Sequence, residues 1–196
     1  MDWKEFISTY WKYYLSLEDD FIRTTRYVEL DESNFNSYSV EYAKQLQAIC
    51  SEIDTICKEI CNFYGDINSK NFPQYTATIL KKYTDISTEN IKVILNDTIN
   101  LEPFKEWNNN SYKSPRWWSE YNAVKHKRNV NFKKANLENV LTSLSGLYVL
   151  EKYLLKDICA KTFNSFDRPD KESEIFIITG WKIKSQSTIK IYMPAP

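Results

Sequence analysis

The sequence predicts a mainly α-helical protein, an up-and-down helical bundle with a small β hairpin or strand pair at its C-terminus. Three observations support this fold class. Long stretches without Pro or Gly carry large apolar side chains at helical spacing, one stretch forms an Ile-rich seam, and short alternating runs follow Pro169. At 196 residues, with 42% hydrophobic and 27% charged residues, the chain has the size and composition of one packed globular domain.

The first half of the chain predicts two long helices. The first is expected from Trp3 to Glu29, which contains no Pro or Gly. The second begins after Ser39, whose hydroxyl can accept a hydrogen bond from the first turn, and ends at Gly65. Its apolar residues alternate steps of four and three, which suits an antiparallel helix neighbour: Tyr42, Leu46, Ile49, Ile53, Ile56, Ile60 and Phe63.

The middle of the chain has weaker patterns. Residues 73–83 predict a short helix with a Pro in its first turn, and residues 91–95 fit either a strand or part of a helix. The run from Asn108 to Ser111 is expected to be a loop. We therefore expect residues 1–165 to form the helical domain, with 66–114 as a variable insertion.

Two further helices and a β appendage are expected in the second half. One helix opens at Pro115 and covers PRWWSEYNAVKHKRN; the other covers about residues 136–163. Gly146 within the latter suggests that another backbone approaches closely. Residues 166–196 are expected to form the β appendage, packed on the same domain because a hairpin alone is marginal.

Composition excludes several functional classes. Lys plus Arg equals Asp plus Glu at 26 each, which argues against a protein whose whole surface binds polyanions. No Gly-rich phosphate-binding motif occurs. No run approaches the roughly 20 apolar residues of a membrane span, and the acidic N-terminus is unlike a signal peptide, so a cytoplasmic location is expected.

The residues that bind metals form no familiar pattern. His126 is the only histidine, which excludes a mechanism with two imidazoles, and neither HExxH nor CxxC occurs. Cys50, Cys57 and Cys61 share one face of the second helix. They fit a metal site or disulfides less well than small apolar core residues in a reducing compartment. No metal or cofactor is expected.

The neutral total hides a strong charge asymmetry. Residues 1–60 hold six basic and twelve acidic residues, a net charge of −6, whereas residues 111–134 hold seven basic residues and one acidic residue, a net charge of +6. One interpretation is a groove for phosphate groups, with Trp117, Trp118 and Tyr121 available for stacking. The other is that the basic helix lies against the acidic helices and neutralises them.

The segment from Trp117 to Arg128, WWSEYNAVKHKR, resembles the histidine-containing helix of HEPN domains (higher eukaryotes and prokaryotes nucleotide-binding). The layout over residues 1–163 is similar as well, since long helices precede this helix and a long apolar helix follows it. Active family members carry an Arg that is often followed by Asn, His or Asp, with a His four to six residues beyond, as in Arg-Asn-x3-His. Here Asn122 and His126 match the Asn and the His, while Tyr121 stands in place of the Arg.

The resemblance implies a bundle of HEPN type that acts on RNA or binds a nucleotide in the cytoplasm. It implies a homodimer whose paired motif helices form a metal-independent endoribonuclease site, in phage defence or in a toxin–antitoxin system with an antitoxin partner. His126 would then be the general acid or base, Asn122 would orient the imidazole or the RNA, and Arg128 would complete the catalytic set.

The remaining residues of this expected site would bind substrate. They are Lys125, Tyr121, Arg116 and Trp118. Arg116 precedes His126 by about 15 Å along the helix, so it cannot replace the missing Arg of the motif in the same chain. On a continuous helix, Arg128 would lie only about 3 Å beyond His126 but roughly 200° around the axis, where it would serve a dimer site or pair with Glu52 or Asp54.

Two alternatives stay open at the level of sequence. His126 could be a half-buried histidine bonded to a carboxylate of the second helix, which would make its role structural. The whole chain could also be a non-catalytic helical module that uses its basic helix and exposed aromatic residues to bind a protein partner.

Overall fold

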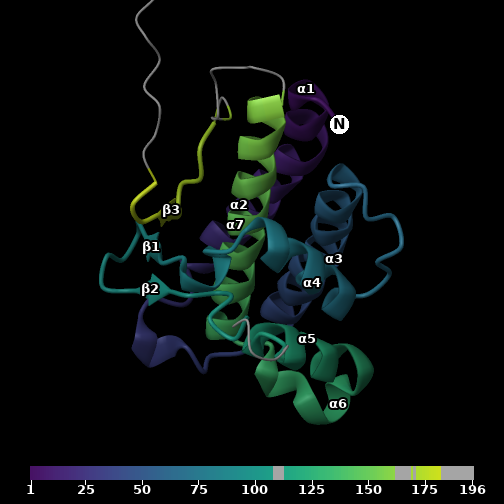
Figure 1. Cartoon of the computed structure of the whole chain (residues 1–196). Coiled ribbons are helices and arrows are strands. Elements are labelled where there is room, and N and C mark those ends of the chain that lie inside the picture. The colour runs from purple at the N-terminus through teal and green to yellow at the C-terminus, as the bar shows by residue number, and fades with distance from the viewer. Residues whose placement is uncertain (108–112, 162–168, 170, 182–196) are drawn as a thin grey trace, which may run out of the picture.

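The computed structural model describes residues 1–107, 113–161, 169 and 171–181, and it is mainly helical (Figure 1). The first helix of the chain combines α1 (Trp3–Phe6), a π-helical turn η1 (Ile7–Trp11) and α2 (Lys12–Thr24) without a break in helical backbone. It ends five residues before the sequence pattern predicts, in a series of turns.

The second long helix agrees closely with expectation. Helix α3 (Val40–Phe63) begins after Ser39, whose Oγ accepts a hydrogen bond from the Tyr42 N–H at 3.0 Å. It ends before Gly65, which has a φ of +80° that Gly adopts without strain. The Ile seam is buried and packs mainly against α7 (Leu137–Lys161).

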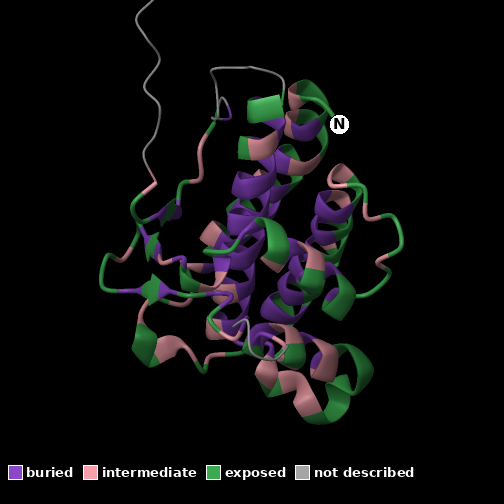
Figure 2. Cartoon of the chain, in the orientation of Figure 1, coloured by how far each residue is buried: buried purple, intermediate pink, exposed green. Residues whose placement is uncertain are grey.

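The central element of the bundle is α7. From residue 143 to residue 155 every side chain is buried, because α1 and α2, α3, α5 (Arg116–His126) and the sheet all pack around it (Figure 2). The sequence predicts a single apolar face, whereas the structure buries nearly the whole circumference. Polar residues such as Ser143 and Glu151 are therefore inside as well.

Gly146 of α7 is closely packed, but its neighbours are side chains and not the nearby backbone that the sequence predicts. A Cβ at this position would lie 3.4 Å from the Phe104 and Trp117 rings and 3.5 Å from the Pro103 side chain. A Cβ would therefore already be in van der Waals contact with two large aromatic side chains, rather than with a second main chain, and a longer side chain has no space here.

The described part of the expected variable insertion, residues 66–107 and 113–114, contributes to the core of the domain. It supplies α4 (Phe72–Lys82), a 3₁₀ turn η3 (Ile86–Thr88) and the strands β1 (Ile91–Val93) and β2 (Asn100–Leu101), which settles the choice between strand and helix for residues 91–95. Buried side chains from this part join the single hydrophobic cluster. The expected loop at residues 108–111 lies outside the described residues.

The C-terminal β element is confirmed in part. Strand β3 (Phe176–Ile178) pairs antiparallel with β1, so the sheet order is β2-β1-β3, with Ile91 opposite both Leu101 and Ile178. The C-terminal part of the expected β appendage, residues 182–196, lies outside the described residues.

Buried polar contacts fix the approach to β3. Glu18 of α2 is almost fully buried and accepts hydrogen bonds from the Tyr14 hydroxyl, the Ser173 hydroxyl and the Glu174 N–H. The Trp11 indole N–H also donates to the Lys171 carbonyl at 2.8 Å. The segment before β3 is thus held on the first helix by side-chain hydrogen bonds.

None of the helices within the described ranges combines the length and the hydropathy that a membrane crossing needs.

Candidate nucleic-acid interface

Helix α5 is fixed in the bundle by one apolar face. Trp117, Tyr121 and Val124 follow helical spacing and are all buried, and the helix packs on α3 and α7. The Trp117 indole N–H donates to the Pro103 carbonyl at 2.7 Å, which satisfies the only polar atom of that ring. The last residues of the helix, Lys125 and His126, are exposed to solvent.

The sequence predicts a continuous helix through Asn129, and this prediction is wrong at the C-terminal end of the helix. Helix α5 stops at His126, because Lys127 leaves helical geometry with φ −142° and ψ 61°, and a separate short helix α6 (Arg128–Asn131) follows. The Asn131 side-chain amide donates to the Ala123 and Lys127 carbonyls at 3.1 and 3.0 Å, which closes the corner. Arg128 therefore belongs to a different helix from His126, and the angle expected on a single helix does not apply.

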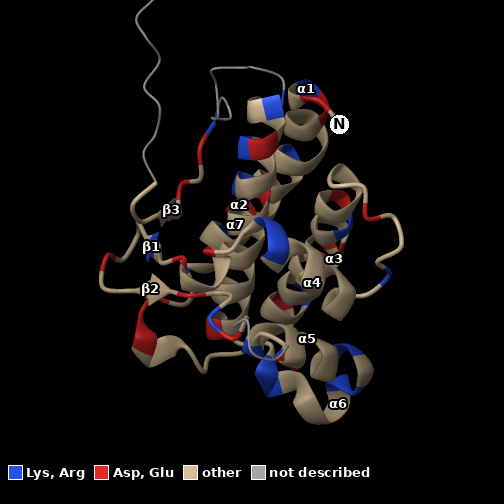
Figure 3. Cartoon of the chain, in the orientation of Figure 1, with Lys and Arg blue, Asp and Glu red and all other residues tan. Residues whose placement is uncertain are grey.

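This corner gathers positive charge, and we call it the basic corner. All of its members are exposed: Lys125, His126, Lys127, Arg128 and Lys133. Among the described residues, none of its three lysines or Arg128 forms an ion pair. Figure 3 shows the blue segments around α6 and at the end of α5.

Neutralisation by the acidic N-terminal helices is slight. The two ion pairs of this segment join Arg116 to Glu138 at 2.9 Å and Lys134 to Glu120 at 2.8 Å, and neither acid belongs to residues 1–60. Burial raises the pKa of Asp54 on α3, and the nearby Lys125 and Lys58 partly oppose that rise. Arg128 makes no ion pair with Glu52 or Asp54, so the basic corner keeps its charge.

The sequence predicts that the aromatic residues of α5 are available for stacking on bases, but the structure places them against other parts of the chain. Trp117 and Tyr121 are 2% and 6% exposed. Trp118 is half-buried and stacks on Phe72, with ring centroids 3.8 Å apart and planes 13° from parallel. These rings anchor the helix, and Tyr121 lies largely in the core rather than on the exposed surface beside His126.

His126 is exposed and makes no hydrogen bond or ion pair within the described part of the chain. The alternative in which His126 is half-buried and bonded to a carboxylate of the second helix is therefore wrong. Asn122 is half-buried, and its side-chain amide donates to the Trp118 carbonyl one turn back, at 3.0 Å. Within one copy of the chain, Asn122 does not orient the imidazole.

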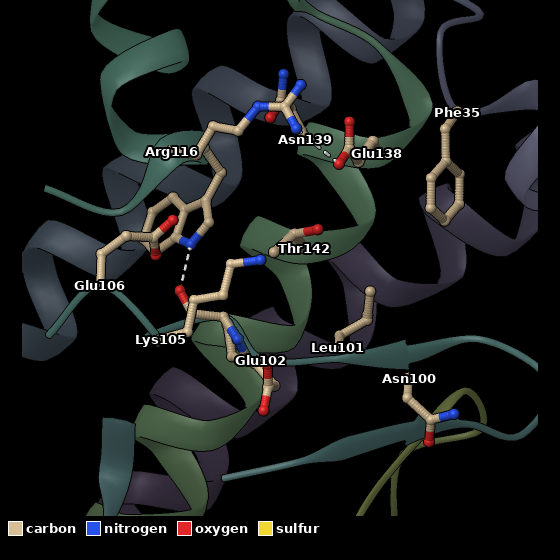
Figure 4. Close-up of a pocket in the computed structure, with 12 residues that line it drawn as sticks. Phe35, Asn100, Leu101, Glu102, Lys105, Glu106, Arg116, Glu138, Asn139 and Thr142 are labelled. Atoms are coloured by element: carbon tan, nitrogen blue, oxygen red, sulfur yellow. Dashed lines mark hydrogen bonds and ion pairs between the residues drawn. The ribbon is translucent and has the colours of Figure 1, made fainter. Parts of the chain in front are cut away.

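Arg116 lies away from the basic corner, at the other end of α5. It pairs with Glu138 beside a cavity of about 170 Å³ formed by the β2 region and the first turns of α5 and α7 (Figure 4). Figure 4 also shows the Lys105 side chain reaching across this cavity toward Thr142. Since Glu102, Glu106 and Glu138 outnumber the two basic residues here, this hollow does not suit a phosphate group.

Cys50, Cys57 and Cys61 are buried and form no disulfide with a described residue, as expected for apolar core residues. Burial is the main cause that raises the pKa of the Cys50 and Cys57 thiols well above the ordinary value, so both stay protonated. In the ranges that the structure describes, no group of three or more metal-binding side chains comes together.

Sequence reasoning missed three parts of this surface. Lys127 and Lys133 counted toward the segment charge but were not assigned to the site, and Asn131 was not recognised as the residue that closes the corner. The polar run Lys127-Arg128-Asn129 after the apolar spacing of α5 was the available signal for a helix end.

No family model, no curated protein and no solved structure matches this chain. The resemblance to HEPN domains thus rests on the motif residues and the order of helices alone.

Proposed function

We propose that this protein is a HEPN-like RNA-binding protein that holds RNA phosphates on the basic corner. One observation carries the proposal: the only histidine lies exposed among three lysines and an arginine that form no ion pair in the described structure. Phosphate oxygens can pair with these cations. Binding of RNA phosphates to such a cluster releases counterions, which favours the complex.

More specifically, we propose that the protein is a metal-independent endoribonuclease. In that reaction the RNA 2′-oxygen bonds to the adjacent phosphorus while the P–O5′ bond breaks, which leaves a 2′,3′-cyclic phosphate and a 5′-hydroxyl. His126 is the general base that removes the 2′-hydroxyl proton or the general acid that protonates the leaving 5′-oxygen, and Lys125 and Arg128 hold phosphate oxygens. Asn122 is bonded to its own helix and Tyr121 is buried, so no described residue of one copy orients the imidazole. We propose that a homodimer completes the site.

A second function has one observation in its favour. Val130 on α6, the same short helix that carries Arg128, is 71% exposed, as expected of a contact with a protein partner such as an antitoxin. In that case the chain is a non-catalytic interaction module.

Salt-dependent RNA binding tests the first function. Four cations at the basic corner predict that the logarithm of affinity falls with the logarithm of salt with a slope of about −3 for single strands, at roughly 0.7 per contact. The double variant Lys127→Glu with Arg128→Glu should lose most of the binding. The matched control, Lys12→Glu with Lys92→Glu, changes the net charge equally at exposed positions elsewhere and should bind far better.

Cleavage is then measured in the presence of a chelator, with His126→Gln as the variant. Loss of cleavage with retained binding supports the endoribonuclease. Binding without cleavage in the wild type leaves RNA binding and refutes the enzyme. A wild type that neither binds nor cleaves RNA at about 0.1 M salt refutes the proposal and favours the interaction module.

A further inference from the structure

RNA bases at the basic corner cannot stack on α5. Trp117 and Tyr121 are in the core, and Trp118 already covers Phe72. An exposed aromatic ring must therefore come from another part of the chain if bases, as well as phosphates, contact the protein.

Tyr38, which precedes α3, supplies such a ring. It is 46% exposed and lies next to two residues that follow α6. The Lys133 Nζ atom is 5.9 Å from the Tyr38 ring centroid, and the Phe132 ring meets Tyr38 edge to face at 5.8 Å and 86°. Because Lys133 belongs to the basic corner, Tyr38 lies at the edge of the same charged surface.

The position of Tyr38 is fixed by its backbone. Tyr38 forms an antiparallel bridge with Asn136, and the adjacent Ser37 carbonyl accepts a hydrogen bond from the Leu137 N–H at 2.9 Å. The contact with Phe132 limits rotation of the ring. A ring held in place before binding loses little entropy when a base stacks on it.

We propose that Tyr38 stacks one unpaired base of a single-stranded RNA whose phosphates lie on Lys133 and the rest of the basic corner. This inference rests on the proposed RNA binding and narrows its substrate class. Every base offers a π face, so the contact has no strong sequence preference. Bases inside a duplex have both faces covered, so a duplex uses the cations alone.

The test compares affinities of labelled RNA by fluorescence anisotropy. The probes are a single-stranded oligouridylate, a duplex of equal length and a single strand with abasic sites. We expect Tyr38→Ala to weaken binding to oligouridylate by about fivefold or more. The same variant should change duplex and abasic-strand affinity less than about twofold, because those probes offer no free base.

Three further variants separate stacking from folding. Tyr38→Phe keeps the ring and should bind like the wild type, whereas Tyr38→Leu keeps apolar bulk against Phe132 and should bind like Tyr38→Ala. Tyr27→Ala, at a tyrosine that is 88% exposed after α2, is the matched control and should not change affinity.

The outcomes distinguish the two proposals. If the wild type binds oligouridylate and both Tyr38→Ala and Tyr38→Leu bind equally well, stacking on Tyr38 is refuted while RNA binding stands. Equal losses on the single strand and the duplex would also refute it. A wild type that binds none of the probes overturns the proposed function, and this inference with it.

Discussion

Glu151 is the least satisfied polar group in the described core. It lies in the middle of α7 with no exposed surface, and neither carboxylate oxygen has a hydrogen-bond partner there. Burial, and to a smaller extent the negative charge of Glu52 on α3, raise the pKa of Glu151 well above its ordinary value of 4.5. We infer that Glu151 is a neutral acid in the folded protein at pH 7.

Replacement of Glu151 by Gln should therefore stabilise the protein at neutral pH. The folded state retains a proton that the unfolded chain releases above about pH 4.5, so Glu151 subtracts stability as the pH rises above that value. From pH 4.5 to 7 this amounts to at most about 3 kcal/mol, at 1.36 kcal/mol per pH unit. The neutral Gln amide avoids this cost and leaves a similar unpartnered group.

Urea unfolding at several pH values measures the difference. We expect Glu151→Gln to gain stability at pH 7, with the gain shrinking toward zero near pH 4.5. Glu41→Gln replaces an exposed glutamate on α3 that pairs with Lys44, and it should change stability by less than about 0.5 kcal/mol. A Glu151→Gln variant that is less stable than the wild type at pH 7, with an unchanged pH dependence, would refute the reasoning.

Two other changes test the helical framework. Ser39→Ala removes the N-cap of α3 and should lower the free energy of unfolding by about 1 kcal/mol, measured by urea titration; no loss would mean that water replaces the cap. Gly146→Leu should lower it by more than about 2 kcal/mol, because a Cβ alone already meets Phe104 and Trp117 at 3.4 Å; a loss below 1 kcal/mol would show that these rings yield freely.

Helix positions were predictable because their signals are local. The Ser39 cap, the Ile seam of α3 and Gly65 each act within a turn or two of the chain, and the structure confirms all three. The role of Gly146 was not predictable in detail. Its neighbours come from residues 103, 104 and 117, and sequence spacing carries no information about which distant residues press on a helix.

The same distinction explains the candidate site. That α5 is helical and basic followed from the sequence, but whether its aromatic residues face solvent depended on Phe72, Pro103 and Phe104, which lie far away in the chain. Tyr38 had no local signal at all. It joins the basic corner only because a backbone bridge to Asn136 brings two segments separated by about a hundred residues together.

Tertiary structure also decides what the charge asymmetry means. Opposite charges in two segments cancel only if the fold pairs the charged side chains. Here α5 packs on α3 through its apolar face, while the residues at its basic end are exposed and form no ion pair with α3. Four neighbouring cations repel one another, which costs the free protein stability, and a bound polyanion removes that cost. Asn131, whose side chain closes the turn between α5 and α6, lies in the chain between Arg128 and Lys133 of the basic corner. Anion binding at the basic corner should therefore stabilise this turn.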